Sequence, residues 1–395
     1  MTSKMDISLQ FKKEIIEVEC RIDLGTNVNQ FQFILNKQLN IKSIQCNEHM
    51  VEWTTLKTYY PTFRVESKQI ELREEDEFNA LIVKYEGPIN GWCNFIKEHA
   101  KALSYYSVWY PQELSEPVED VWVNINQLSD HTVLKADYDK MTERWVYGGN
   151  GYDICNILAF KNGYYFLEQC GDLAIYYLNS EETKVVEYIK YYYEDVMEYY
   201  INDLFKTGSL NQLDIVSLGI KEDGQGGYFR KELVVFTDFL VECPTDHEIE
   251  LYFASLISHE LAHHWCTGAN EDSWEDWLNE TTAECSSLLY ALKRNNLELF
   301  NYIIEPKLDR HLELPEIKTA DESRPNGVHD KGTVLFYFIY KKYGVETLKN
   351  LVSIFNDLEK KTTKSYLNLI ESKLGSQTAN LIESNLGNRT FEILL

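Results

Sequence analysis

The apolar pattern of this 395-residue chain changes near residue 180, and this change constrains the fold more than any other feature of the sequence. Before it, short apolar runs rich in β-branched and aromatic residues alternate with turn signals, which is typical of strands. These runs are Ile15–Ile22, Phe31–Leu35, Ile70–Leu72, Leu81–Tyr85, Val121–Ile125 and Leu173–Tyr177. We therefore expect residues 1–182 to form an antiparallel β domain of the sandwich or saddle type.

Beyond residue 180 the apolar residues recur at helical spacing, first in the segment Glu181–Phe205. Two strand-like runs, Leu213–Leu218 and Leu233–Phe236, follow it and predict a small sheet. The other expected helical segments are Glu248–Cys266, Trp274–Asn295, Gly332–Tyr343, Val345–Glu359 and Thr363–Leu386. The pattern thus predicts an α+β protein whose second domain, residues 183–395, is mostly helical.

The net charge limits the partners that the chain can bind, and the cysteine pattern indicates its cellular compartment. With 63 acidic and 38 basic side chains, the formal net charge is −25, so nucleic-acid phosphates and anionic membranes would repel the chain and neither is expected as a partner. The start of the chain lacks the pattern of a secretory signal, and the longest apolar runs are too short to cross a bilayer. The eight cysteines are scattered without a CxxC pair, which favours reduced thiols and a cytoplasmic location. The oligomeric state stays open.

A metal-binding motif lies inside the helical segment Glu248–Cys266. His259 and His263 stand four positions apart, and Glu260 follows the first of them. Because positions i and i+4 share one face of a helix, both imidazoles can bind one ion. Glu260 can reach a water on that ion, and zinc lowers the pKa of such a water to about 7. The motif therefore predicts a zinc site with Glu260 as general base.

The third ligand is expected on the next helical segment, at Glu280 in the run Trp277-Leu278-Asn279-Glu280. Three protein ligands leave the fourth position open, as a catalytic zinc requires. Glu284, one turn further on, can accept the outer N–H of a zinc-bound histidine and so fix its tautomer. The other acidic residues between the two helices are expected to be solvated surface, or to cap a helix, and not to be ligands; these are Glu271, Asp272, Glu275 and Asp276.

These motifs together resemble the aminopeptidase N family of gluzincin zinc metallopeptidases, in which HExxH is followed by a glutamate in a WLNE context. The resemblance plausibly covers the whole chain. It implies an N-terminal β domain, a thermolysin-like catalytic domain and one Zn²⁺ per chain. By the same resemblance, we expect the chain to stop near the close of the family's catalytic domain, short of the helical C-terminal domain that usually covers the cleft.

The resemblance extends to two further motifs. Gly226, Gly227 and Tyr228 stand where the family has a substrate-binding loop, and the family's transition-state tyrosine is replaced by His329. A histidine N–H can donate to the oxyanion of a tetrahedral intermediate, so His329 is a candidate catalytic residue. The alternative is a surface histidine at a helix start that only supports the site.

The substrate-binding loop itself departs from the family. Phe229 replaces the glutamate that holds a substrate's free amino group, so exopeptidase and endopeptidase activity both stay open. Arg230 is expected either to bind a substrate carboxylate or to pair with Glu232.

The expected function is hydrolysis of peptide or amide bonds by a metal-activated water. Two alternatives remain: a zinc amidase or esterase that acts on a small metabolite, and an inactive, zinc-bound peptide-binding protein. Glu260 argues against the inactive protein, because a purely structural zinc needs no acid beside an open metal position. The expected substrate is therefore a peptide or a small amide.

Overall fold

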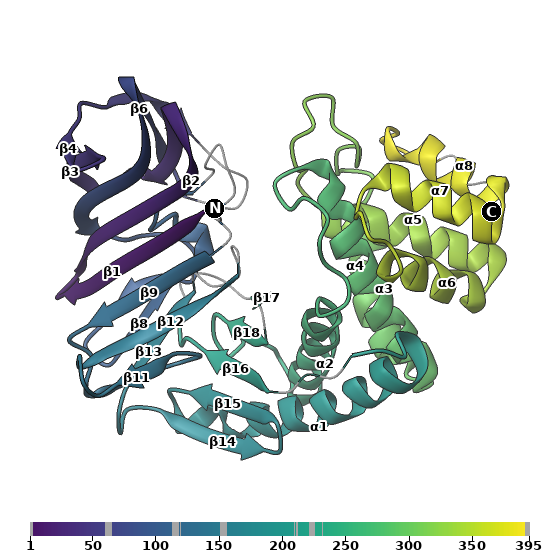
Figure 1. Ribbon diagram of the computed structural model, residues 1–395. Coiled ribbons are helices and arrows are strands. Elements are labelled where there is room, and N and C mark those ends of the chain that lie inside the picture. Colours follow the sequence, from purple (N-terminus) through teal and green to yellow (C-terminus); the bar gives the residue numbers. More distant parts are fainter. Residues whose placement is uncertain are drawn as a thin grey trace. The chain divides into compact units, whose positions relative to one another are not determined.

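The computed structural model describes residues 3–59, 65–112, 118, 120–150, 156–208, 210, 212–220, 226–230 and 232–391. It divides into two compact units, one of Met1–Phe166 with Ile220–Gly224, the other of Leu167–Gly219 with Gln225–Leu395. Figure 1 shows strands in the first unit and mostly helices in the second. The α+β class expected from the sequence is confirmed. The sequence had placed the division after residue 182, whereas β15 (Leu173–Tyr177) pairs within the second unit's sheet.

The larger sheet of the first unit is built on two long antiparallel strands, β2 (Ile15–Asn36) and β6 (Ser67–Pro88). The sequence showed each of them as two separate runs, because polar and exposed residues interrupt the alternation, as at residues 26 and 27 of β2. The sheet order is β11-β12-β9-β1-β2-β6-β3-β4, and β5 also pairs with β6. Its other strands are β1 (Lys4–Lys12), β3 (Asn40–Cys46), β4 (His49–Met50), β5 (Thr54–Tyr59), β9 (Asp120–Asn126), β11 (Asp137–Asp139) and β12 (Arg144–Asn150).

The first unit is a sandwich, but its larger sheet is not purely antiparallel. A second sheet has the order β10-β13-β8-β7, with β10 (His131–Val133), β13 (Ile157–Lys161), β8 (Ala100–Leu103) and β7 (Phe95–Ile96). Apolar side chains from both sheets, such as Val18 and Ile157, share one core. Strand β1 pairs parallel with β9. The chain passes through the second sheet between β6 and β9, and a long connection, unlike a hairpin, permits parallel pairing.

The second unit begins with a five-stranded sheet in the order β14-β15-β16-β18-β17. Strands β15, β16 (Leu213–Ser217) and β18 (Leu233–Phe236) run parallel, whereas β17 (Gly227–Arg230) pairs antiparallel with β18 at one end of the sheet. The other end is β14 (Phe166–Cys170). Strand β16 is buried along its whole length, as expected for a strand covered on both faces.

Helices make up the rest of the second unit and share one apolar core with its sheet. They are α1 (Thr183–Tyr199), with a π-helical turn over Tyr200–Leu204, α2 (Asp246–Ala262), α3 (Trp277–Lys293), α4 (Leu297–Arg310), α5 (Val328–Tyr343), α6 (Val345–Asn356), α7 (Thr363–Leu374) and α8 (Ser376–Leu386). Helix α4 was not expected from the sequence. Gly375, with a φ of 91°, separates α7 from α8, which the sequence showed as one helix. Among the residues described, no helix is long and apolar enough to span a membrane.

Helices α3 and α5 approach closely at Gly332. A Cβ atom built on Gly332 would lie only 1.8 Å from Thr281 Oγ1, so a larger residue cannot stand there unless the Thr281 side chain or one of the helices shifts. Thr281 follows Glu280 and is fully buried. The α5 backbone at Gly332 thus packs directly against the side chain next to Glu280.

We expect Gly332→Ala to lower the free energy of unfolding by about 1–3 kcal/mol, because overpacking forces the surroundings to move. Gly387→Ala is the matched control, since a Cβ there would meet nothing within 4 Å. Denaturant unfolding of both variants tests this. Equal stability of the two variants and the natural chain would contradict the close-packing argument.

Candidate metal centre

The structure brings together the three side chains that the sequence singled out as ligands. His259 lies in the last turn of α2, His263 caps that helix, and Glu280 lies in the first turn of α3. The two Nε2 atoms are 3.1 Å apart, and Glu280 Oε2 lies 3.5 Å from that of His259 and 3.6 Å from that of His263. Donors around a tetrahedral zinc with bonds of about 2.0–2.1 Å stand roughly 3.3–3.4 Å apart. The spacing therefore fits one zinc ion.

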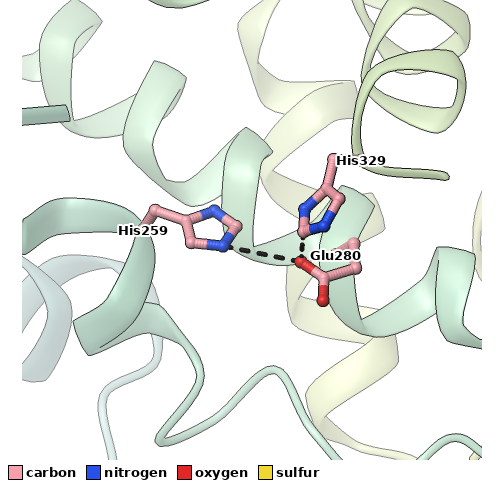
Figure 2. Close-up of side chains that lie close together, drawn as sticks. All are labelled: His259, Glu280 and His329. Atoms are coloured by element: carbon pink, nitrogen blue, oxygen red, sulfur yellow. Dashed lines mark ion pairs between the residues drawn. The ribbon is translucent and has the colours of Figure 1, made fainter. Parts of the chain in front are cut away.

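The charge balance at Glu280 also fits a cation. Its Oε2 atom is buried and has no hydrogen bond of good geometry among the described residues, although His329 Nδ1 lies 2.7 Å away. A buried carboxylate oxygen is costly unless positive charge lies beside it. The two imidazoles converge on this oxygen, and a divalent cation between them would satisfy it. His259, Glu280 and also His329 offer donor atoms within 4.8 Å of one another (Figure 2).

The outer nitrogens of the two imidazoles face groups that can hold their tautomers. His263 Nδ1 lies 3.1 Å from the carbonyl oxygen of Cys266, to which an N–H can donate. That leaves a lone pair on Nε2, the atom that faces the centre. Burial lowers the pKa of His263 to about 4, so the ring is in the neutral form that metals bind. On the other ring, His259 Nδ1 lies 3.6 Å from Glu284 Oε1, the position expected from the sequence.

Glu284 belongs to a row of buried charges that the sequence did not reveal. Lys307 of α4 lies 2.9 Å from Glu284 and 3.5 Å from Asp330 of α5. Burial alone would raise the pKa of Glu284, but Lys307 and His259 hold that pKa below its ordinary value. Glu284 thus stays ionised and can accept from His259. Arg310, 2.7 Å from Asp330, extends the row.

Glu260 is buried beside the two imidazoles. Burial, with the charge of Glu280, raises the pKa of Glu260 to about 7, although His259 and His329 act in the opposite direction. A carboxyl group that titrates near neutral pH is well suited to accept and return a proton.

His329 lies in the first turn of α5, with 41% of its side chain exposed. Its Nδ1 atom is 2.7 Å from Glu280 Oε2, and Figure 2 shows the two groups facing each other. The next residues hold the helix start in place. Lys331 donates to the carbonyl oxygens of His311 and Leu314, at 3.0 and 3.1 Å. The structure therefore places His329 beside Glu280 and Lys331 in a structural contact.

One expectation about the acidic segment between α2 and α3 is wrong. Asp276 and Glu275 are not solvated surface: Asp276 is buried against Arg324, and Glu275 accepts from the backbone and side chain of Thr363, both at 2.6 Å. Their partners come from segments 48 and 88 residues away, so no local pattern could show them. Arg324 is a residue near the centre that the sequence did not single out.

The substrate loop is described from Gly226 to Arg230, in and beside β17. Gly227 is explained by packing, since a Cβ there would lie 2.6 Å from the Phe236 ring. Tyr228 is 5% exposed. Arg230 pairs with Glu271 at 2.6 Å rather than with Glu232, the partner that the sequence offered. The charge of Arg230 is close enough to lower the pKa of Glu260.

Phe229 is 9% exposed and belongs to the core of the second unit. Its ring lies edge-on to the His264 ring at 6.4 Å. The position where the resembling family holds a substrate's amino group is therefore occupied by a packed phenyl ring.

Comparisons with known proteins find solved structures with a similar fold but no relative that is similar in sequence. No family model matches the chain, and no curated protein is similar to it in sequence. An M1 zinc metallopeptidase from Deinococcus radiodurans has a similar structure, with a TM-score of 0.63 at 13% identity over 98% of this chain and 94% of the other.

Two longer proteins are also similar in structure. Leukotriene A4 hydrolase from Saccharomyces cerevisiae has a TM-score of 0.67 at 11% identity, over 97% of this chain and 66% of the hydrolase. Legionella pneumophila aminopeptidase A has 0.69 at 12%, over 97% of this chain and 49% of the aminopeptidase. At such identities the likeness shows a shared fold. This chain spans only about half of the Legionella protein.

The contact of Glu284 with His259 predicts that Glu284→Ala weakens zinc binding by about 10–100-fold, as removal of such outer contacts typically does. Glu298→Ala is a matched control, because Glu298 pairs with His247 at 2.8 Å on the surface. Titration of zinc against a competing chelator measures both affinities. An unchanged affinity in Glu284→Ala would show that this contact does not support a ligand.

Proposed function

We propose that this protein is a zinc-dependent hydrolase of peptide or amide bonds, with one ion held by His259, His263 and Glu280. The observation that carries the proposal is the convergence of three donor atoms, 3.1–3.6 Å apart, next to a buried glutamate. The shared fold of zinc metallopeptidases supports it.

Glu260 is the general base of the proposed reaction. Bound zinc would supply a water of lowered pKa in its open fourth position. The Glu260 carboxylate then accepts the proton of the attacking water and returns it to the leaving nitrogen. Without a metal ion, burial raises the pKa of Glu260 to about 7. A bound cation beside it would favour the carboxylate, which is the form that accepts a proton.

His329 is the proposed donor to the oxyanion that forms when water attacks the carbonyl. Its Nδ1 atom faces Glu280 Oε2 at 2.7 Å. Once a zinc ion took that oxygen, an N–H on Nδ1 would be free to donate to a substrate oxygen at the centre. One such donor typically contributes about 2.7–4 kcal/mol to the transition state. The exposed part of the ring leaves room for substrate to approach.

The proposed substrate is a peptide or amide without a free amino group at the scissile end. Phe229 offers no anion to pair with an ammonium group, and a buried unpaired ammonium is costly. Strand β17 lies at an edge of its sheet, and its backbone can add an extended peptide as a further strand. Gly226, Gly227 and Tyr228 would line that peptide, with Arg230, held by Glu271, at its end.

We also place this reaction in the cytoplasm. The cysteines that the structure describes are all free, and most of them are buried. Free thiols persist in a reducing compartment. We propose no nucleic-acid or membrane partner besides the substrate, because the acidic chain would be repelled by nucleic acid and by anionic membranes.

The first prediction separates metal binding from catalysis. Purified protein should hold about one zinc per chain, and Glu260→Gln should keep the zinc while kcat falls by about 10²–10⁴-fold, because only the proton acceptor is lost. Removal of the metal by a chelator should abolish turnover, and added zinc should restore it. His263→Ala is the variant that loses the ion. Turnover by Glu260→Gln at the natural rate would rule out its role as base.

The second prediction concerns the substrate's end. N-acetylated fluorogenic peptides should be cleaved at least as well as the same peptides with free amino ends, because Phe229 gives an ammonium group no partner. A mixed set of peptides, assayed as matched pairs, measures the ratio of kcat/KM. A strong preference for peptides with free amino ends would contradict the proposed substrate, but it would leave the proposed zinc site standing.

A further inference from the structure

Arg324 is a buried arginine that meets the metal centre from outside the zinc motif. Its side chain, in the segment between α4 and α5, is only 5% exposed. The segment is held to the start of α3 by a bridge between Ser273 and Ser323. Arg324 Nε pairs with Asp276 Oδ2 at 2.5 Å. This pair anchors the guanidinium group and leaves its Nη2 atom facing the centre.

Through Nη2, Arg324 contacts both Glu280 and His329. The atom lies 3.5 Å from Glu280 Oε1 and 3.5 Å from His329 Nε2. Glu280 therefore has one oxygen toward a fixed cation and the other, Oε2, toward the imidazoles of His259 and His263. A carboxylate held in this way can give a single oxygen to a metal ion and leave the fourth position for water.

The same contact determines which nitrogen of His329 carries the proton. A guanidinium group has donors only, so His329 Nε2 must be the acceptor in this contact. The proton of the neutral ring is then on Nδ1, the nitrogen that lies 2.7 Å from Glu280 Oε2. Arg324 thus leaves an N–H on the side of His329 that faces the centre.

We infer that Arg324 is a positioning residue that orients the Glu280 carboxylate and sets the tautomer of His329. The inference rests on the proposed function, because it gives Arg324 a role in zinc binding and in oxyanion stabilisation. A merely structural arginine would serve only to neutralise buried Asp276. The two roles differ in what they predict for zinc affinity and for His329.

The first experiment compares zinc affinity among variants of this pair. Arg324→Met leaves Asp276 buried without a partner, which destabilises the fold, so the double variant Arg324→Met/Asp276→Asn removes both charges together. Arg324→Lys keeps the charge but not the planar fork. Arg294→Met is the matched control, since Arg294 pairs with Asp195 and Glu198 at 2.8 and 2.9 Å and is no part of the centre. Thermal unfolding checks that each variant is folded.

In a titration against a chelator, zinc should bind about 10–100-fold more weakly to the double variant than to the natural chain. The zinc affinity of Arg324→Lys should lie between these two, and that of Arg294→Met should equal the natural value. The absorption spectrum of the cobalt-substituted protein should shift in the double variant, because the ligand geometry changes. A folded double variant with natural zinc affinity and an unchanged cobalt spectrum would overturn the role of Arg324 at Glu280.

The second experiment tests the link to His329 by a double-mutant cycle on kcat. His329→Phe should lower kcat while zinc affinity stays the same, and Arg324→Lys should lower kcat less in the His329→Phe background than in the natural chain. Additive losses would overturn the tautomer argument. Wild-type protein that binds zinc but hydrolyses nothing would reject the proposed function, while the zinc and cobalt measurements would still decide the role at Glu280. Wild-type protein that binds no zinc would reject both.

Discussion

A carboxylate buried between two imidazoles is the interaction on which the rest of the second unit depends. Glu280 Oε2 lies about equally far from the Nε2 atoms of His259 and His263, at 3.5 and 3.6 Å. Such a group is costly to bury unless positive charge faces it. The fold supplies such groups from two directions, with Arg324 3.5 Å from the other oxygen and His329 Nδ1 2.7 Å from Oε2. The helices around Glu280 can be understood as the supports of these contacts.

The supports come from segments that are distant in sequence. Helix α4 contributes Lys307 and the segment after it contributes Arg324, so two cations face two glutamates of α3. Each buried acid thereby has a buried partner, which keeps the set ionised. Helices α2 and α3 carry the proposed ligands, and this outer set of charges would orient them. The centre is therefore a property of four helices and not of the HExxH helix alone.

The ligands could be predicted from the sequence because their geometry is local. The i, i+4 spacing places His259 and His263 on one face whatever surrounds the helix. Asp276 was misjudged because its partner lies 48 residues away and only the tertiary fold brings the two together. Helix α4 was missed for a similar reason: Pro306 lies inside it, which argues against a helix locally, and its packing against the core supplies the missing stability. The long strands β2 and β6 were split where their central residues are exposed.

The contact at Gly332 links the two helices that carry the proposed chemistry. The α5 backbone packs directly against the Thr281 side chain, which leaves little room for α5 and α3 to slide past each other there. The proposed metal-binding carboxylate and the proposed oxyanion donor would then keep their mutual spacing before substrate arrives. Adjustment to substrates of different size would then fall to β17, which ends its sheet and, among the described residues, pairs with β18 alone. A fixed spacing of the proposed catalytic groups beside an adjustable edge strand would let one reaction geometry serve varied sequences.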